Sequence, residues 1–325
     1  MKQFFAKPFR FSSLYGAVLV LFALFVVLDT FVIPHGYTVV DPPPTEPRPS
    51  VSATDSDKTD TEKTDTEKTD IERTDSEEED LTPQITANSY KDANISITVT
   101  TMRVHSTDVH VAEVILSSPE YLKTAFAKNT YGRNIKETTS VIADRVGAIL
   151  AVNGDFYGFR NEGYVIRNGV LYREDRFSAS REDLVIDKAG KMYSVREGKV
   201  SAVDLWYEDV QQVLSFGPVL VEDYEIQVDE DDEIGKLESN PRCAVGMIEP
   251  LHYLFVVSDG RTKQSAGLSL LELAEFMWDW DCQFAYNLDG GGSATMVFNG
   301  KVINNPTDGR SSGERKVSDI VCIGY

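Results

Sequence analysis

The sequence predicts an α+β fold, with mixed but largely antiparallel sheets and a few helices. Short runs of alternating apolar and polar residues recur from about residue 84 to the C-terminus, which is typical of strands. The few segments with helical periodicity do not alternate regularly with these runs, as they would in a parallel α/β fold. The chain before residue 84 has a different composition. We therefore expect one folded domain, residues 84–325, preceded by a transmembrane helix and a disordered linker.

An apolar segment near the N-terminus, residues 14–33, has the length of a helix that crosses a bilayer. Three basic residues lie within residues 1–13, and the next basic residue is Arg48. By the positive-inside rule, residues 1–13 are then cytoplasmic and the rest of the chain is extracytoplasmic. The alternative is a cleaved signal peptide, but no clear small-residue cleavage motif follows the segment. We expect a single-pass protein of the cell membrane, anchored through residues 14–33.

The segment from residue 34 to residue 83 is predicted to be a disordered linker. It begins with a proline-rich stretch and continues with a five-residue acidic repeat of the type KTDTE, from Lys58 to Glu77. It has almost no apolar residues to bury, so it cannot form a core. Calcium capture by the acidic residues is an alternative, but nothing in the repeat fixes a coordination geometry. A spacer between the membrane and the domain is the simpler interpretation.

Charge and cysteine content exclude several classes of function. The formal net charge of −20 argues against binding to nucleic acid through a general electrostatic field. The three cysteines, Cys243, Cys282 and Cys322, are widely spaced and form no CxxC pair, so we expect buried free thiols. The four histidines form no HExxH motif, and no nucleotide-binding glycine motif is present. No metal or other cofactor is predicted.

Individual elements can be placed within the domain. Ser269 and Glu272 have the spacing of a capping box and begin a helix that continues to about residue 280. Further helices are expected at 119–128 and 139–147. Asn168-Gly169 lies between two alternating runs and predicts a hairpin turn. Strands are expected at 95–99, 109–111, 148–153, 184–186, 192–195, 213–216, 243–248, 251–257, 284–288, 295–298 and 319–323.

Polar residues and glycines follow three of the apolar strands. The sequences are Asn153-Gly154-Asp155, Asp259-Gly260-Arg261, and Asp289 followed by three glycines. Ordinary turns use the same residue types. Three consecutive glycines, however, cost conformational entropy that a plain turn does not require, and they let a backbone approach a ligand closely. Arg242 and Arg261 offer planar forks that suit a phosphate, although a structural ion pair would use them equally well.

These motifs, in this order, resemble the phosphodiester glycosidase family. The resemblance extends from about Tyr121 to Tyr325 and is carried by NGDFY (153–157), GPVLV (217–221), NPRCAVG (240–246), SDGR (258–261), NLDGGGSATM (287–296) and ER-V (314–317). It implies hydrolysis of a sugar-1-phosphodiester, a glycosyl-phosphate linkage. Asp155 stands where family members often have glycine, which adds a carboxylate to this motif.

The motifs supply the candidate site residues. Catalytic candidates are Asp289, Asp259, Asp155 and Glu314. Substrate-binding candidates are Asn153, Gly154, Arg242, Arg261, Asn287, Gly290, Gly291, Gly292, Ser293 and Thr295.

A membrane anchor makes a sugar-phosphate or cell-envelope glycan the expected substrate. The alternative function is a non-catalytic envelope module that binds sugar-phosphate polymers. Such a module would share the arginines with the enzyme but would not need Asp259 and Asp289 to converge. A structural or assembly protein that keeps the motifs as remnants of the fold is a third possibility.

Overall fold

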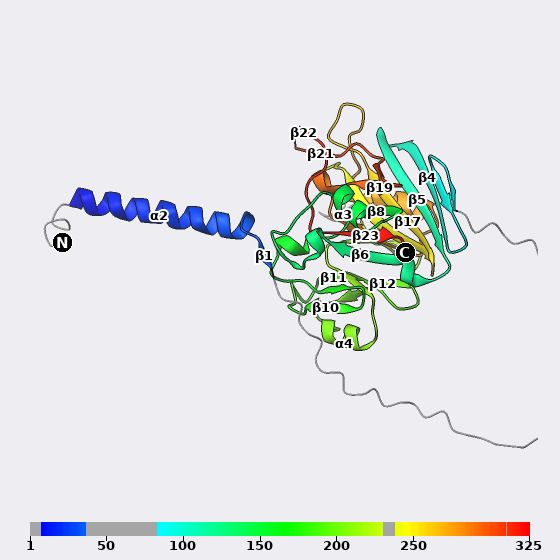
Figure 1. Ribbon diagram of the computed structural model, residues 1–325, viewed down its shortest axis with the longest axis horizontal. Coiled ribbons are helices and arrows are strands. Elements are labelled where there is room, and N and C mark those ends of the chain that lie inside the picture. The colour runs from blue at the N-terminus through cyan, green and yellow to red at the C-terminus, as the bar shows by residue number, and fades with distance from the viewer. Residues whose placement is uncertain (1–7, 37–82, 230–237, 310) are drawn as a thin grey trace, which may run out of the picture.

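The computed structural model describes residues 8–36, 83–229, 238–309 and 311–325 (Figure 1). Most of the expected linker, from residue 37 to residue 82, lies outside the described residues. The described part of the chain confirms the α+β class, with several sheets and few helices. Every strand pairing recorded for these residues is antiparallel, so the expected mixed character is not found there.

The N-terminal helix α2 (Pro8–Phe31) covers most of the expected transmembrane segment and projects away from the sheets in Figure 1. After it, β1 (His35–Gly36) pairs with β7 (Gly132–Arg133), which joins the end of this segment to the folded domain. Within the residues that the structure describes, no helix is both long enough and apolar enough to cross a membrane.

Three sheets build the domain, and the largest has nine strands. In spatial order these strands are β15 (Glu225–Ile226), β14 (Val219–Glu222), β18 (Phe284–Leu288), β16 (Arg242–Glu249), β17 (His252–Ser258), β5 (Thr107–Leu116), β4 (Ile95–Val104), β3 (Ser89–Lys91) and β2 (Gln84–Ile85).

The other two sheets have five strands each. One is ordered β20 (Lys301–Val302), β19 (Met296–Phe298), β8 (Leu150–Asn153), β23 (Asp319–Ile323) and β6 (Leu122–Phe126). The other is ordered β10 (Val170–Arg173), β9 (Val165–Arg167), β13 (Gln212–Leu214), β11 (Glu182–Ile186) and β12 (Met192–Arg196). A small additional pair is formed by β21 (Thr307–Asp308) and β22 (Ser311–Ser312).

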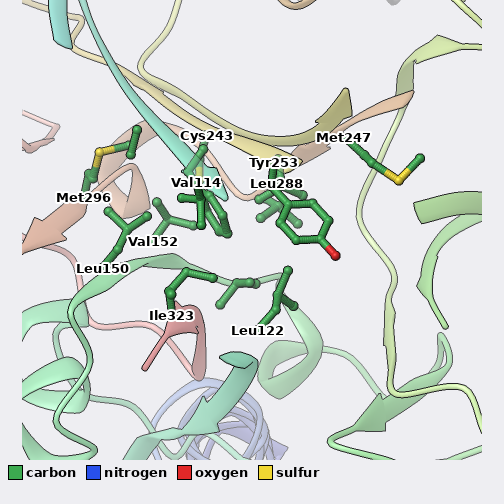
Figure 2. Close-up of a cluster of buried hydrophobic side chains, with 14 of the residues drawn as sticks. Val114, Leu122, Leu150, Val152, Cys243, Met247, Tyr253, Leu288, Met296 and Ile323 are labelled. Atoms are coloured by element: carbon green, nitrogen blue, oxygen red, sulfur yellow. The ribbon is translucent and has the colours of Figure 1, made fainter. Parts of the chain in front are cut away.

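The main hydrophobic core lies where these sheets face one another. Figure 2 shows Leu150, Val152 and Ile323 from the β8 sheet opposite Cys243 and Leu288 from the nine-stranded sheet, and all five side chains are buried. Alternating apolar residues along the strands supply these inward faces. The core therefore fixes β8 against β16 and β18, the strands from which the candidate motifs emerge.

Each sheet also packs against one helix. The residues of α5 (Leu270–Asp279) pack on the nine-stranded sheet, those of α3 (Thr139–Arg145) on the β8 sheet, and those of α4 (Ala202–Tyr207) on the β11 sheet. The predicted capping box of α5 is present, because the Ser269 hydroxyl accepts from the Glu272 N–H and the Glu272 carboxylate accepts from the Ser269 N–H.

One predicted helix is wrong. Residues 119–128 form a short 3-10 turn, Pro119–Tyr121, and then strand β6, which pairs with β23. Long-range strand pairing overrides the helical pattern of this short segment. The helix α4 was not predicted, although its capping box of Ser201 and Asp204 is visible in the sequence.

The predicted hairpin turn at Asn168-Gly169 and the predicted buried free thiols are confirmed. Asn168 and Gly169 both have positive φ angles and connect β9 to β10. The three cysteines are free and buried.

Candidate active site

The candidate motifs meet at one edge of two sheets because of the strand directions. Strands β8, β17 and β18 end at Asn153, Ser258 and Leu288, and the antiparallel strands β16 and β23 begin beside them. Asn153 pairs with Ile320, and Leu288 pairs with Cys243. Loops that leave these strand ends are therefore neighbours, although Asn153 lies more than 100 residues before the other two strand ends in the sequence.

Asn153 connects the two sheets at this edge. Its side-chain nitrogen donates to the carbonyl oxygen of Asp289 at 2.6 Å, and its side-chain oxygen accepts from the N–H of Thr295 at 3.2 Å. The side chain is fully buried. These bonds bring the NGD loop and the triple-glycine loop together, and they fix the backbone on both sides of Asp289.

Asp289 lies at the end of β18 and is half-buried. Burial raises the pKa of its carboxyl group, whereas the Ser293 hydroxyl and the charges of Arg315 and Arg160 act in the opposite direction. A partly desolvated carboxylate whose charged form is favoured by arginine charges is suited to interact with a developing positive charge. The two arginines were not among the candidates from the sequence.

The three glycines after Asp289 are required by packing within the protein. A Cβ atom on Gly290 would lie 2.7 Å from the carbonyl oxygen of Pro241, and Gly291 has a φ of +60°. The N–H of Gly291 donates to the same carbonyl oxygen, and the carbonyl oxygen of Gly292 accepts from the N–H of Arg315. These glycines thus allow a close approach to neighbouring protein segments, and their contact with a ligand stays a prediction.

Asp155 is buried, and several protein groups bind its carboxylate. One oxygen accepts from the N–H of Tyr157 at 2.9 Å, and the other accepts from the N–H of Ser215 at 2.9 Å. The latter oxygen also forms an ion pair with Arg167 at 3.0 Å. These contacts suit a positioning role, in which Asp155 holds the loop that carries Asn153.

Arg167, the ion-pair partner of Asp155, belongs to a buried charge cluster that was not predicted from the sequence. Arg167 also pairs with Asp319 at 2.8 Å, so one guanidinium lies between two carboxylates. Burial raises the pKa of Asp319 to about 7, although the charge of Arg167 lowers it. A Cβ atom on Gly154 would lie 2.3 Å from an oxygen of Asp319, which explains the glycine at this position.

Asp259 and Glu314 occupy different surroundings. Asp259 is buried, accepts from the N–H of Asn305 at 2.8 Å and lies 3.7 Å from Nε2 of His110. Glu314 accepts from both the N–H and the hydroxyl of Ser140, in the first turn of α3. The contacts of Glu314 stabilise this helix terminus, where a carboxylate is favoured.

Arg242 and Arg261 are close enough for their charges to interact. Burial and the charge of Arg261 lower the pKa of Arg242 to about 10. Arg242 donates to the carbonyl oxygens of Leu268 and Glu238, at 2.9 and 3.1 Å. Arg261 is exposed and donates to the side chain of Asn240. Some N–H groups of the Arg242 guanidinium thus already donate to protein carbonyl groups, whereas Arg261 lies at the surface.

Asn287 and Thr295 complete the predicted set. The side-chain nitrogen of Asn287 donates to the carbonyl oxygen of Gly217 at 2.7 Å, which fixes the loop before β14. The Asn287 oxygen and the Thr295 hydroxyl are buried and have no hydrogen-bond partner among the described residues. Unpaired buried polar atoms are rare in folded proteins and often occur at functional sites.

Asp183 is another buried acid that was not predicted, and it makes stability depend on pH. Burial and the charge of Glu197 raise its pKa to about 8. An unfolded aspartate has a pKa of about 4, so between about pH 4 and pH 8 the folded state binds more protons than the unfolded state. We therefore expect the free energy of unfolding to fall as the pH rises through this range. Urea denaturation at several pH values should show a flatter dependence for Asp183→Asn than for the wild type.

The exposed Asp175 provides a control for this experiment, because Asp175→Asn should leave the pH dependence unchanged. An Asp183→Asn variant with the wild-type slope would show that Asp183 is not the group responsible.

Comparisons with known proteins identify the family. The phosphodiester glycosidase profile matches residues 146–324, which is more than half of the chain. The chain belongs to the phosphodiester glycosidase family. Among the described residues, no cluster of three or more histidine, cysteine, aspartate or glutamate side chains is arranged to hold a metal ion.

Two relatives match parts of this chain that differ in length. The SPbeta prophage-derived protein YomE of Bacillus subtilis is 30% identical over 204 residues, which cover 60% of this chain and 31% of YomE. Mouse N-acetylglucosamine-1-phosphodiester alpha-N-acetylglucosaminidase is 38% identical over 107 residues, which cover 30% of this chain and 20% of the enzyme. The chain thus spans about a third or less of the length of these relatives.

Two solved structures share the fold. The catalytic domain of the zebrafish N-acetylglucosamine-1-phosphodiester alpha-N-acetylglucosaminidase, auto-inhibited by its pro-peptide, aligns with a TM-score of 0.57 at 23% identity. The alignment covers 71% of this chain and 83% of the zebrafish domain. A hypothetical protein from Synechocystis aligns with a TM-score of 0.51 at 13% identity, covering 71% of this chain and 62% of that protein.

Proposed function

We propose that this protein is a hydrolase that releases a sugar from a sugar-1-phosphodiester. The observation that carries the proposal is the half-buried Asp289, which follows β18 where the strand ends converge and whose backbone is held by the side chain of Asn153. Membership of the phosphodiester glycosidase family supports the same chemistry. The names of the mammalian relatives make an N-acetylglucosamine-1-phosphodiester the first substrate to test.

The reaction breaks the bond between C1 of the sugar and the phosphate oxygen, and water supplies the new hydroxyl group. The phosphate monoester leaves with the bonding electrons, and positive charge develops at C1. A carboxylate at Asp289 stabilises this charge. Asn153 and Asp155 position the loop beside Asp289, and Arg261 and the glycine loop line the same edge of the sheets.

Incubation of the full-length protein with UDP-N-acetylglucosamine tests the proposal. We expect free N-acetylglucosamine and UDP to appear together, and Asp289→Asn to serve as the inactive comparison. A folded wild-type protein that binds sugar-1-phosphodiesters and releases no sugar from any of them would favour the non-catalytic binding module instead.

We also propose that residues 14–33 anchor the protein in the cell membrane and that the substrate is an extracytoplasmic envelope glycan. This proposal rests on the apolar composition of the segment and on the basic residues that precede it. Protease added to intact cells should cut the acidic linker and release the domain. A full-length chain that stays protected would contradict this topology.

A further inference from the structure

Two arginines beside the site lie against the same aromatic ring. Arg160 follows the NGDFY loop, and Arg181 precedes β11. The guanidinium of Arg160 lies 5.7 Å from the centroid of Phe177, and that of Arg181 lies 4.6 Å from it. Arg160 also lies over the rings of Phe156 and Phe216, each at 5.4 Å. These distances permit cation–π attraction, which holds both guanidinium groups in place.

The two positive charges are not neutralised by an ion pair. Among the described residues, neither Arg160 nor Arg181 lies within ion-pair distance of a carboxylate. Burial and the charge of Arg181 lower the pKa of Arg160, although the charge of Asp155 acts in the opposite direction. Each contributes a hydrogen bond to the same turn: Arg160 donates to the carbonyl oxygen of Ser215 at 3.0 Å, and Arg181 donates to that of Phe216 at 2.5 Å. An arginine has five N–H donors, so most of them are not used by these bonds.

The position of this arginine pair relates it to the proposed reaction. Arg160 lies on the loop that follows Asn153, and the Asn153 side chain donates to the carbonyl oxygen of Asp289. The turn that both arginines contact is joined to the site, because the Ser215 N–H donates to Asp155. Arg242 has fewer unused donors, because two backbone carbonyl groups accept from its guanidinium, whereas one accepts from each of Arg160 and Arg181.

We propose that Arg160 and Arg181, together with the Phe177 ring that both contact, form a subsite for the phosphate group of the sugar-1-phosphodiester. Two adjacent guanidinium groups with unused donors match the charge and the several oxygen atoms of a phosphate. The subsite lies beside the loop that carries Asn153 and Asp155, and Asn153 holds the backbone of Asp289. The identity of the ligand rests on the proposed function. Binding of a phosphate group at this subsite, however, can be measured without turnover.

Calorimetric titration of the full-length protein with two ligands tests the subsite. The ligands are N-acetylglucosamine 1-phosphate and N-acetylglucosamine, which differ only in the phosphate. We expect Arg160→Met and Arg181→Met each to weaken binding of the phosphorylated sugar about tenfold or more and to leave binding of the neutral sugar unchanged. Arg176→Met is the matched control, because Arg176 is exposed on the same loop and should contribute nothing.

Each result of the titration either supports the subsite or overturns it. If the methionine variants lower the melting temperature, Arg160→Lys and Arg181→Lys keep the charge without the planar fork and should still weaken binding of the phosphorylated sugar at a wild-type melting temperature. Wild-type affinity in these variants, or loss of phosphate binding only in Arg261→Met, overturns the proposal. Normal phosphate binding without hydrolysis of any sugar-1-phosphodiester would instead overturn the proposed enzymatic function.

Discussion

Asp289→Asn is expected to fold like the wild type and to lose about 10²- to 10⁴-fold in turnover, because removal of one catalytic group commonly costs this much. Asparagine keeps the shape of the side chain and suits the same turn conformations, but it carries no charge. The backbone around Asp289 is fixed by Asn153, whose side chain binds the Asp289 carbonyl oxygen rather than its carboxylate. The substitution therefore removes the charge and leaves this connection intact. Single-substrate kinetics with a thermal melt of each variant is the measurement.

Asp259→Asn provides the comparison for this experiment. Asp259 accepts from the Asn305 N–H and faces His110, so part of its role is to hold neighbouring segments, and we expect a smaller loss of turnover. Near-wild-type turnover in Asp289→Asn would contradict the catalytic assignment. The remaining candidates, Asp155 and Glu314, already accept hydrogen bonds from protein groups, which makes them weaker alternatives.

Elements with local signals could be predicted from the sequence. The bounds expected for 284–288 and 319–323 agree with β18 and β23, because each is a mainly apolar run that is followed by a polar residue or a glycine. The capping box of α5 and the Asn-Gly turn depend only on residues close in sequence. Asn153 and Asp289 were both singled out at strand ends, but the bond between them was not predicted.

Features that depend on long-range pairing could not be predicted in the same way. Arg167 pairs with Asp319, which is 152 residues away, and no spacing rule connects the two positions. A signal was present, since Arg167 is a charged residue directly after the apolar Val165-Ile166. The sequence around Arg167 does not by itself show whether this arginine is buried in the strand or exposed beside the turn. Arg160 was missed for the same reason, because its neighbours come from loops distant in sequence.

Arg167→Met is expected to lower the free energy of unfolding by about 3–5 kcal/mol, the usual cost of removing one partner from a buried ion pair. Arg167, Asp155 and Asp319 are all buried. Methionine fills part of the space, but it leaves two carboxyl groups without their positive partner in a region that excludes water. Urea denaturation at neutral pH measures the change.

Arg196→Met is the matched control for this substitution. Arg196 pairs with Glu182 at 2.8 Å, but 63% of its side chain is exposed, so we expect a loss of no more than about 1 kcal/mol. Adding Asp319→Asn to Arg167→Met removes one of the two unpaired charges and should restore part of the stability. Equal stability of Arg167→Met and Arg196→Met would contradict the role of the buried cluster. Asp155 belongs to this cluster and Gly154 packs against Asp319, so Arg167→Met should also reduce the turnover of the protein that remains folded.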